Sequence, residues 1–258
     1  MKLSIITINL NNAEGLRKTL ESVVNQNFTD YEYIVIDGGS TDGSADIIKQ
    51  YADKITYRVS EPDNGIYNAM NKGIRVAKGE YCLFLNSGDW LMENNGLQYI
   101  FDRKPVEDIV YCDIQTEYGI RNMREKLTIY NSIISHQSTF IKTVLFSTVG
   151  YYNENNKIVS DWEFLINAIF KFQCSYQYIS SVLTYIDNSG ISSNIAFQEL
   201  CQKERENVLK ESFPMMYDDY RQLLSLSKEI IPYRNSRLIQ VIRKMQSTSF
   251  YKKIKGVK

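Results

Sequence analysis

The chain has 258 residues, of which 43% are hydrophobic and 23% charged, and its 30 acidic side chains balance its 30 lysines and arginines. Such usage is ordinary for a folded protein, so it excludes a disordered chain and a fibrous repeat. The four cysteines form no C-x-x-C pair, which excludes zinc-site spacing and a thioredoxin motif. No stretch reaches the roughly eighteen apolar residues of a membrane span, so we expect a cytoplasmic protein, soluble or peripheral.

The first 90 residues alternate between short β-branched or aromatic runs and segments of helical periodicity. This alternation predicts βαβ units, and hence a mostly parallel sheet flanked by helices. The expected strands are Leu3–Ile8, Tyr33–Ile36, Ile55–Ser60 and Tyr81–Leu85. Parallel sheets place their ligands at the carboxyl ends of the strands, so the loops after Ile8, Ile36 and Leu85 should converge.

The pattern is weaker after residue 90. Asp108–Asp113 and Ser138–Ile141 are expected as strands, Asp161–Phe172 as an amphipathic helix, and residues from about 195 onward as helices. We therefore predict an α/β fold with one domain over residues 1–215 and a basic helical C-terminal extension over residues 216–258.

The sequence Asn86-Ser87-Gly88-Asp89 follows the apolar run that ends at Leu85. A carboxylate at a strand's end, beside a glycine that lets a ligand approach the backbone, suits a hard cation carrying diphosphate oxygens. Magnesium or manganese often takes only one or two protein carboxylates in such a site. Taken alone, these four residues are more often a plain turn.

Several segments together carry a resemblance to a known family. They are Asp37-Gly38-Gly39-Ser40-Thr41-Asp42-Gly43, the run from Glu61 to Gly73 that contains Asp63-Asn64-Gly65-Ile66-Tyr67-Asn68, and Leu85-Asn86-Ser87-Gly88-Asp89. In this order they resemble the donor-binding half of the inverting family 2 glycosyltransferases. The resemblance is dense over residues 3–90 and rests, further on, on Ser135-His136-Gln137 and Ser160-Asp161-Trp162-Glu163.

The resemblance implies a GT-A (Rossmann-like) fold, a sugar donor activated as a nucleoside diphosphate, and a divalent metal, Mn²⁺ or Mg²⁺. Residues 1–90 would be the nucleotide-sugar-binding half and residues 91–215 the acceptor half. The residues implied in donor binding are Thr7, Asn9, Asp37, Asp63, Asn71, Lys72, Asn86, Ser87 and Gly88.

The sequence departs from the family pattern at two donor positions. Gly38 stands where many relatives have a second Asp, so Asp37 is left to serve the ribose or the loop. Met70 stands where relatives often have Arg, and Lys72 is the nearest cation that could contact a phosphate. The alternative for Lys72 is a solvated helix residue.

The family's D-x-D metal motif is matched only at its last member, so Asp89 is the expected metal ligand. His136, the only histidine, is a further candidate, since imidazole is a competent ligand for manganese. Alternatively His136 is structural or a neutral hydrogen-bond partner. His136, Gln137 and Trp162 are expected on the acceptor side.

Inverting transfer needs a base that takes the proton of the acceptor hydroxyl. Asp161 aligns with the family's base position, at the start of a predicted helix. The alternative is a carboxylate that merely stabilises a helix N-terminus. Glu163 is the second candidate for the base, although by helix spacing it faces elsewhere.

The C-terminal segment from Lys228 to Lys258 holds nine lysines and arginines against Glu229 alone. Interleaved with apolar and aromatic residues, these cations could bind an anionic inner membrane leaflet. The alternative is a solvated helical face with a frayed end. Nucleic acid is not expected as a partner, because the rest of the chain is acidic.

From these features we expect a glycosyltransferase that moves a hexosyl or N-acetylhexosaminyl group with inversion from a nucleoside-diphosphate donor, expected to be a UDP-sugar. The acceptor would be a glycan or a lipid-linked hydroxyl in cell-surface polysaccharide biosynthesis. A sugar nucleotidyltransferase is disfavoured, because no Gly-rich triphosphate loop follows the first strand. A non-catalytic nucleotide-sugar or glycan-binding module would have no use for Asp89 and Asp161 together.

Overall fold

A mixed β-sheet forms the centre of the chain in a computed structural model that describes residues 1–124, 134–187, 195–234 and 236. Among these residues the sheet has nine strands in the order β3-β2-β1-β4-β8-β6-β9-β5, with β7 paired to β6. The strands are β1 Leu3–Asn9, β2 Tyr31–Asp37, β3 Tyr57–Ser60, β4 Tyr81–Phe84, β5 Trp90–Leu91, β6 Ile109–Thr116, β7 Gly119–Arg121, β8 Thr139–Lys142 and β9 Tyr176–Tyr185.

The directions of the strands bring several loops to one edge of the sheet. Strands β3, β2, β1 and β4 are parallel, and β6 is parallel to β9. Strand β8 runs antiparallel to both β4 and β6, so these two strands share a direction. The carboxyl ends of β1, β2, β4, β6 and β9 therefore lie along the same edge, where ligands of parallel sheets bind.

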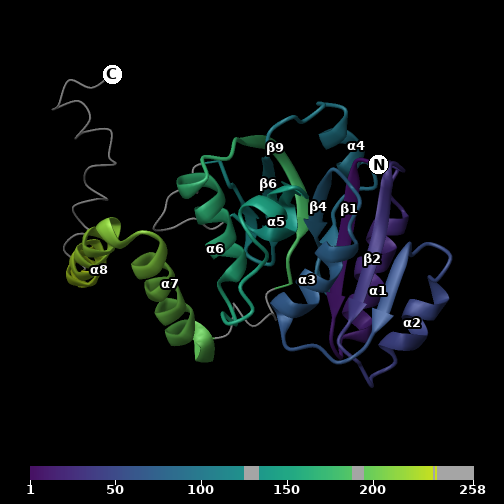
Figure 1. Cartoon of the computed structure of the whole chain (residues 1–258), viewed down its shortest axis with the longest axis horizontal. Coiled ribbons are helices and arrows are strands. Elements are labelled where there is room, and N and C mark those ends of the chain that lie inside the picture. Colours follow the sequence, from purple (N-terminus) through teal and green to yellow (C-terminus); the bar gives the residue numbers. More distant parts are fainter. Residues whose placement is uncertain (125–133, 188–194, 235, 237–258) are drawn as a thin grey trace. The chain divides into compact units, whose positions relative to one another are not determined.

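Helices cover both faces of the sheet (Figure 1). They are α1 Ala13–Val24, α2 Ser44–Gln50, α3 Ile66–Val76, α4 Gly96–Phe101, α5 Leu145–Thr148 and α6 Ser160–Ile166. Alternate residues of β1 enter two different hydrophobic clusters: Ile5 packs with α1, α2 and α4, whereas Ile6 packs with α3, α5 and α6. All seven residues of β1 are buried, as expected for a central parallel strand covered on both faces.

Two glycines and one carboxylate fix how neighbouring segments pack against β1, away from the edge where the carboxyl ends of the strands lie. A side chain at Gly73 would lie 2.5 Å from Ile6, so its absence lets α3 approach the sheet. A side chain at Gly79 would meet the backbone of Ser4 at 2.4 Å. The buried Glu32 accepts hydrogen bonds from the Ser4 hydroxyl and from the backbone N–H groups of Lys78 and Gly79.

The predicted strands are found with shifted ends, and some elements differ from the prediction. The third strand begins at Tyr57 rather than Ile55, and the strand predicted at Asp108–Asp113 extends to Thr116. The helix predicted over Asp161–Phe172 is α-helical only over α6. It continues as a π-helical turn over Asn167–Lys171, in which the Phe172 N–H bonds to the Asn167 carbonyl. Strand β9 was not predicted, and its buried and exposed residues do not alternate as those of a half-buried strand do.

By its contacts the chain divides into two compact units, Met1–Arg205 and Glu206–Lys258. The first contains the sheet and helices α1 to α6. A 3₁₀ turn at Ile195–Phe197 precedes α7, Gln198–Ser212, and α8 follows over Pro214–Arg234, so the predicted helical C-terminal part is present. Within the described ranges, no helix is both long enough and apolar enough to cross a membrane.

Candidate active site

The ends of β1 and β2 are joined by a buried polar pair. Asn9 and Asp37 are register partners, and the Asn9 Nδ2 donates to Asp37 Oδ1 at 2.7 Å. The same carboxylate also accepts hydrogen bonds from the Ser40 hydroxyl, the Ser40 N–H and the Ser60 hydroxyl. Burial works to raise the pKa of Asp37, but these hydrogen bonds outweigh it and lower the pKa. Asp37 is therefore an ionised anchor for the loops after β1, β2 and β3.

Thr7 and Asn9 differ in what they offer a ligand. The Thr7 hydroxyl is fully buried and lies 3.0 Å from the Tyr33 hydroxyl, inside the core. The Asn9 side chain is also buried, but its Oδ1 has no hydrogen-bond partner within the described part of the chain. A buried acceptor without a partner is costly, so Asn9 is the better placed of the two to receive a donor group.

Gly38 faces the carboxylate of Asp63. A side chain at Gly38 would lie 2.5 Å from Asp63 Oδ2, so the missing side chain makes room for this carboxylate. The other oxygen, Oδ1, accepts the Gly65 N–H at 2.9 Å and so fixes the start of α3. Asp63 thus brings a carboxylate to the space that the missing side chain of Gly38 leaves open.

Asn71 and Lys72 are bound to other parts of the protein. The buried amide of Asn71 donates to the Tyr152 carbonyl and to Glu154 and accepts the Tyr152 N–H, which ties α3 to the segment around residue 152. The Lys72 ammonium lies 2.8 Å from Glu61 and 3.1 Å from the Pro62 carbonyl. Their predicted donor contacts would therefore compete with these bonds.

The Asn86-Ser87-Gly88-Asp89 loop is fixed by α1. Asn12 donates to the Ser87 carbonyl, while the Thr19 hydroxyl accepts the Gly88 N–H and contacts the Asp89 carbonyl at 2.7 Å. Gly88 has φ 104°, which side chains rarely adopt. A side chain there would also come within 3.4 Å of Asp187 Oδ2.

Asp89 is a buried carboxylate that accepts hydrogen bonds from two uncharged groups. Its Oδ1 accepts the Asp187 N–H at 3.0 Å, and its Oδ2 accepts the Gln137 amide at 3.1 Å. Burial raises the pKa of Asp89 to about 6, because these two uncharged donors offset only part of the lost hydration. The nearby Asp187 also raises it.

The carboxylate oxygens of Asp89 can still bind a divalent cation. Each carboxylate oxygen of Asp89 keeps a second lone pair, and a cation would relieve the cost of its buried charge. In the described ranges no three His, Cys, Asp or Glu residues are placed to hold a metal together. Asp89 therefore fits a cation whose shell is mostly completed by phosphate oxygens and water, and not one held by the protein alone.

His136 connects this loop to Asp161. On a 3₁₀ turn, His136–Ser138, its Nδ1 lies 2.7 Å from Asp161 Oδ2 and its Nε2 lies 3.2 Å from Asn86 Nδ2. The Tyr67 hydroxyl lies 2.9 Å from Asp161 Oδ1. Burial works to raise the pKa of Asp161, but the hydrogen bonds from His136 and Tyr67 outweigh it and hold the pKa below its usual value.

The other predicted residues of this region, on the 3₁₀ turn and on α6, contact different parts of the structure. Gln137 reaches Asp89, as described above. Trp162 is buried, with the Arg205 guanidinium 5.2 Å from its ring centroid. Glu163 accepts the Asn156 amide at 2.8 Å, on a loop before the helix, so it faces away from His136 as helix spacing predicts. The structure thus joins Asn86, Asp89, His136, Gln137 and Asp161 through direct contacts.

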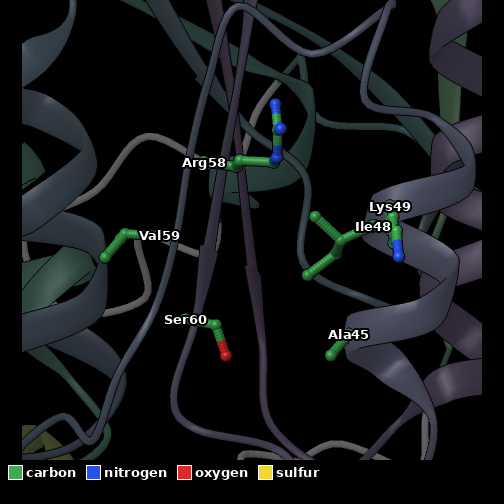
Figure 2. A pocket seen from close by; sticks show the side chains of 6 residues that line it. All are labelled: Ala45, Ile48, Lys49, Arg58, Val59 and Ser60. Carbon is green, nitrogen blue, oxygen red and sulfur yellow. The ribbon is translucent and has the colours of Figure 1, made fainter.

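A separate pocket lies between α2 and β3, and Figure 2 shows the side chains that line it. Ala45, Ile48 and Lys49 come from α2, and Arg58, Val59 and Ser60 from β3. Only Ser60 of these contacts a predicted site residue, through its hydroxyl on Asp37. The pocket is therefore beside the Asp37 loops rather than at Asp89 or Asp161.

The sequence model described as Glycosyl transferase family 2 matches residues 4–158, which is more than half of the chain. The chain belongs to glycosyl transferase family 2. This family 2 member is 32% identical over 213 residues to a PGL/p-HBAD biosynthesis glycosyltransferase of Mycobacterium bovis, across 78% of this chain and 82% of the relative. It is 31% identical over 172 residues to the cholesterol galactosyltransferase of Borreliella burgdorferi, across 64% of this chain and 48% of the relative.

Two solved structures share the fold of this family 2 member. TarS 1–349 of S. aureus in complex with UDP-GlcNAc has a TM-score of 0.64 at 20% identity, over 82% of this chain and 71% of that one. The mannosyltransferase PcManGT of Pyrobaculum calidifontis, in complex with GDP-Man and Mn²⁺, has a TM-score of 0.64 at 13% identity, over 99% and 83%. The predicted GT-A fold is confirmed.

Sequence reasoning named candidate residues but missed several of the contacts that they make. His136 and Asp161 were both proposed for the site, but their contact spans 25 positions, and no local pattern predicts it. Tyr67 lies 94 positions before Asp161 and was missed, although it is part of the quoted Asn64-Gly65-Ile66-Tyr67 motif. Asp187 follows β9, which was itself not predicted.

Proposed function

We propose that this family 2 member transfers a hexosyl or N-acetylhexosaminyl group, with inversion, from a nucleoside-diphosphate donor to an acceptor hydroxyl. The observation that carries the proposal is the chain of contacts from Asp89 and Asn86 through Gln137 and His136 to Asp161. It sets a candidate cation-binding carboxylate and a candidate base in one connected site. Inverting transfer uses a base for the acceptor hydroxyl and positive charge or hydrogen-bond donors for the leaving diphosphate.

The base step uses Asp161 in its ionised form, which its lowered pKa favours at neutral pH. Asp161 takes the proton of the acceptor hydroxyl as that oxygen bonds to the anomeric carbon. The bond from this carbon to the phosphate oxygen breaks, and its electron pair leaves with the nucleoside diphosphate. A single displacement of this kind inverts the anomeric configuration.

Donor binding is assigned to the loops after β1, β2, β3 and β4. Asn9 has an acceptor without a partner, Asp63 has a carboxylate beside Gly38, and Asp37 holds these loops in place. Asp89 would hold Mn²⁺ or Mg²⁺, which when bound supplies positive charge for the leaving diphosphate. A UDP-sugar is the proposed donor, and the TarS neighbour binds UDP-GlcNAc.

The proposed acceptor is a lipid-linked or glycan hydroxyl in the synthesis of cell-surface polysaccharide or glycolipid. Two relatives support a lipid acceptor through their names, which refer to PGL biosynthesis and to cholesterol. We also propose that the basic C-terminal segment brings the enzyme to the cytoplasmic face of an anionic membrane. Most of that segment lies outside the described residues, so its sequence alone supports this part.

A donor screen tests the function. Turnover is measured with UDP-glucose, UDP-galactose, UDP-GlcNAc and GDP-mannose, each with Mn²⁺, against lipid and glycan acceptors. Asp161→Asn serves as the catalytic control, and NMR of the product gives its anomeric configuration. We expect turnover of one donor and an inverted product. A retained configuration, or equal turnover by Asp161→Asn, would contradict the proposal.

A vesicle experiment tests the membrane part separately. Binding of the full chain to anionic vesicles is compared with binding of a variant in which Lys252, Lys253 and Lys255 are replaced by glutamine. We expect the variant to bind more weakly, and both proteins to lose binding as salt is raised. Equal binding by the two proteins would show that these lysines do not anchor the enzyme.

A further inference from the structure

The imidazole of His136 uses both of its nitrogens in contacts with the site. Nδ1 lies 2.7 Å from Asp161 Oδ2, and Nε2 lies 3.2 Å from the side-chain nitrogen of Asn86. An ionised carboxylate only accepts hydrogen bonds, and an amide nitrogen only donates them. Nδ1 therefore donates to Asp161, while Nε2 faces the Asn86 amide. The orientation of the His136 ring is in this way set by its contact with Asp161.

The opposite oxygen of Asp161 has a partner that suits its protonated form. The Tyr67 hydroxyl has one proton but lies near two acceptors, the Ile158 carbonyl at 2.6 Å and Asp161 Oδ1 at 2.9 Å. While Asp161 is ionised, these two acceptors share that proton. Once Asp161 receives a proton on Oδ1, it can donate to the Tyr67 oxygen while Tyr67 donates to Ile158. Asp161 can thus take up a proton without losing its bond to His136.

The contacts of His136 argue against a role as metal ligand. The Nε2 that would face a cation is covered by the Asn86 amide, and Nδ1 carries the proton that bonds to Asp161. The neighbouring Gln137, and not His136, contacts Asp89. The Asn86 Oδ1 is buried without a partner in the described residues, so rotation of this amide could also satisfy a charged imidazole.

We propose that His136 is a positioning residue that aims Asp161 at the acceptor and couples it to the loop carrying Asn86. The inference rests on the proposed function, because it assigns the base role to Asp161. It places the effect of His136 in turnover rather than in nucleotide affinity. It also assigns the essential contact to Nδ1 and the lesser one to Nε2.

Two variants separate the two nitrogens. Asparagine can place its amide nitrogen near the position of Nδ1, whereas the longer glutamine can place its amide oxygen near the position of Nε2. His136→Asn should therefore keep a donor to Asp161, and His136→Gln should keep the contact with Asn86. We expect kcat of His136→Gln to fall by about 100-fold, the cost of a misplaced catalytic group, and that of His136→Asn to fall far less. UDP affinity should stay unchanged in both and also reports that the variants are folded.

The outcomes are distinct from those of the proposed function. Normal turnover by Asp161→Asn would overturn the base assignment itself. Loss of turnover by Asp161→Asn together with equal kcat values for both His136 variants would overturn only the positioning role. Loss of UDP and Mn²⁺ affinity in the His136 variants would instead assign His136 to the metal.

A spectroscopic test needs no substrate. The chain has one histidine, so imidazole ¹H–¹⁵N signals of the full-length protein belong to His136 alone. We expect the pattern of the Nδ1–H tautomer, and we expect it to change in Asp161→Asn. A proton on Nε2 alone, or a spectrum indifferent to Asp161→Asn, would overturn the inference.

Discussion

The Asn86–Asp89 loop and the start of α6 each hold a largely buried carboxylate, and their surroundings shift its pKa in opposite directions. Asp89 receives hydrogen bonds from a backbone N–H and an amide, and burial raises its pKa to about 6. Asp161 receives hydrogen bonds from an imidazole and a tyrosine, and its pKa is lowered. Environments that push two carboxylates apart in pKa indicate two different roles. The first suits a cation site and the second a base.

The largest expected effect is on turnover, at the start of α6. Asp161→Asn keeps the size of the side chain but removes its basicity, so kcat should fall by about 100- to 10,000-fold. UDP affinity, measured by calorimetry, should remain near that of the unchanged protein. Loss of UDP binding instead would mean that the two regions do not have separate tasks.

The next effect is on stability, at Asp89. An unfolded Asp titrates near pH 3.9, so with a folded pKa of about 6 the native state holds this proton more tightly. Ionising Asp89 therefore costs folding free energy as pH rises from about 4 to about 6, by at most about 3 kcal/mol. Asp89→Asn removes this cost, so it should stabilise the fold at pH 8 and have little effect at pH 4.

Urea unfolding with a chelator at both pH values measures this difference. Asp46→Asn, on the exposed side of α2, is the matched control and should change stability little at either pH. An Asp89→Asn protein no more stable than the unchanged chain at pH 8 would contradict the contrast between the two carboxylates.

A smaller effect is expected on the donor side, at Gly38. A methyl group there would push the end of the Asp63 side chain, which is flexible, so the fold should be little affected. If Asp63 bonds to the donor, Gly38→Ala should weaken UDP affinity by about tenfold, the value of about one hydrogen bond. Asp63→Asn should weaken it as well. Calorimetry that finds both affinities unchanged would remove Asp63 from the donor site.

The smallest effect is expected at Glu163, the second candidate for the base. Its carboxylate is bonded to Asn156, away from His136. Glu163→Gln should therefore leave kcat within about twofold, since a surface-side substitution typically shifts free energies by less than about 0.5 kcal/mol. A loss of turnover comparable with that of Asp161→Asn would transfer the base role to Glu163.

The sequence predicted the parts of the fold that depend on local patterns. Buried strands such as Leu3–Asn9 are recognised by their apolar runs, and the donor loops by their small polar residues. Strand β9 was missed because its buried and exposed residues do not alternate along the strand. The α6 helix was predicted too long, because the π-helical turn keeps apolar residues inward while changing the hydrogen-bond spacing.

The sequence predicted which residues belong to the candidate site, but it did not predict the contacts between them. Asp89 and Asp161 were named for their roles, which stay predictions until tested. That His136 bonds to Asp161 and Asn86, or that Asp63 lies against Gly38, depends on contacts between segments far apart in sequence. Such contacts follow from the packing of the sheet and are not encoded in any short motif.

The buried Glu32 bears on how this enzyme could be altered. It joins β2 to Ser4 and to the turn at Lys78 and Gly79, which precedes β4. The candidate ligand-binding residues Asn9, Asp37 and Asp89 lie at or after the carboxyl ends of β1, β2 and β4. Anchoring and chemistry thus occupy opposite ends of the same strands. Directed evolution toward new donors or acceptors can vary the loops at one end while the other preserves the scaffold. Conversely, libraries that randomise residues near Glu32 should yield mostly poorly folded proteins and few changes in specificity.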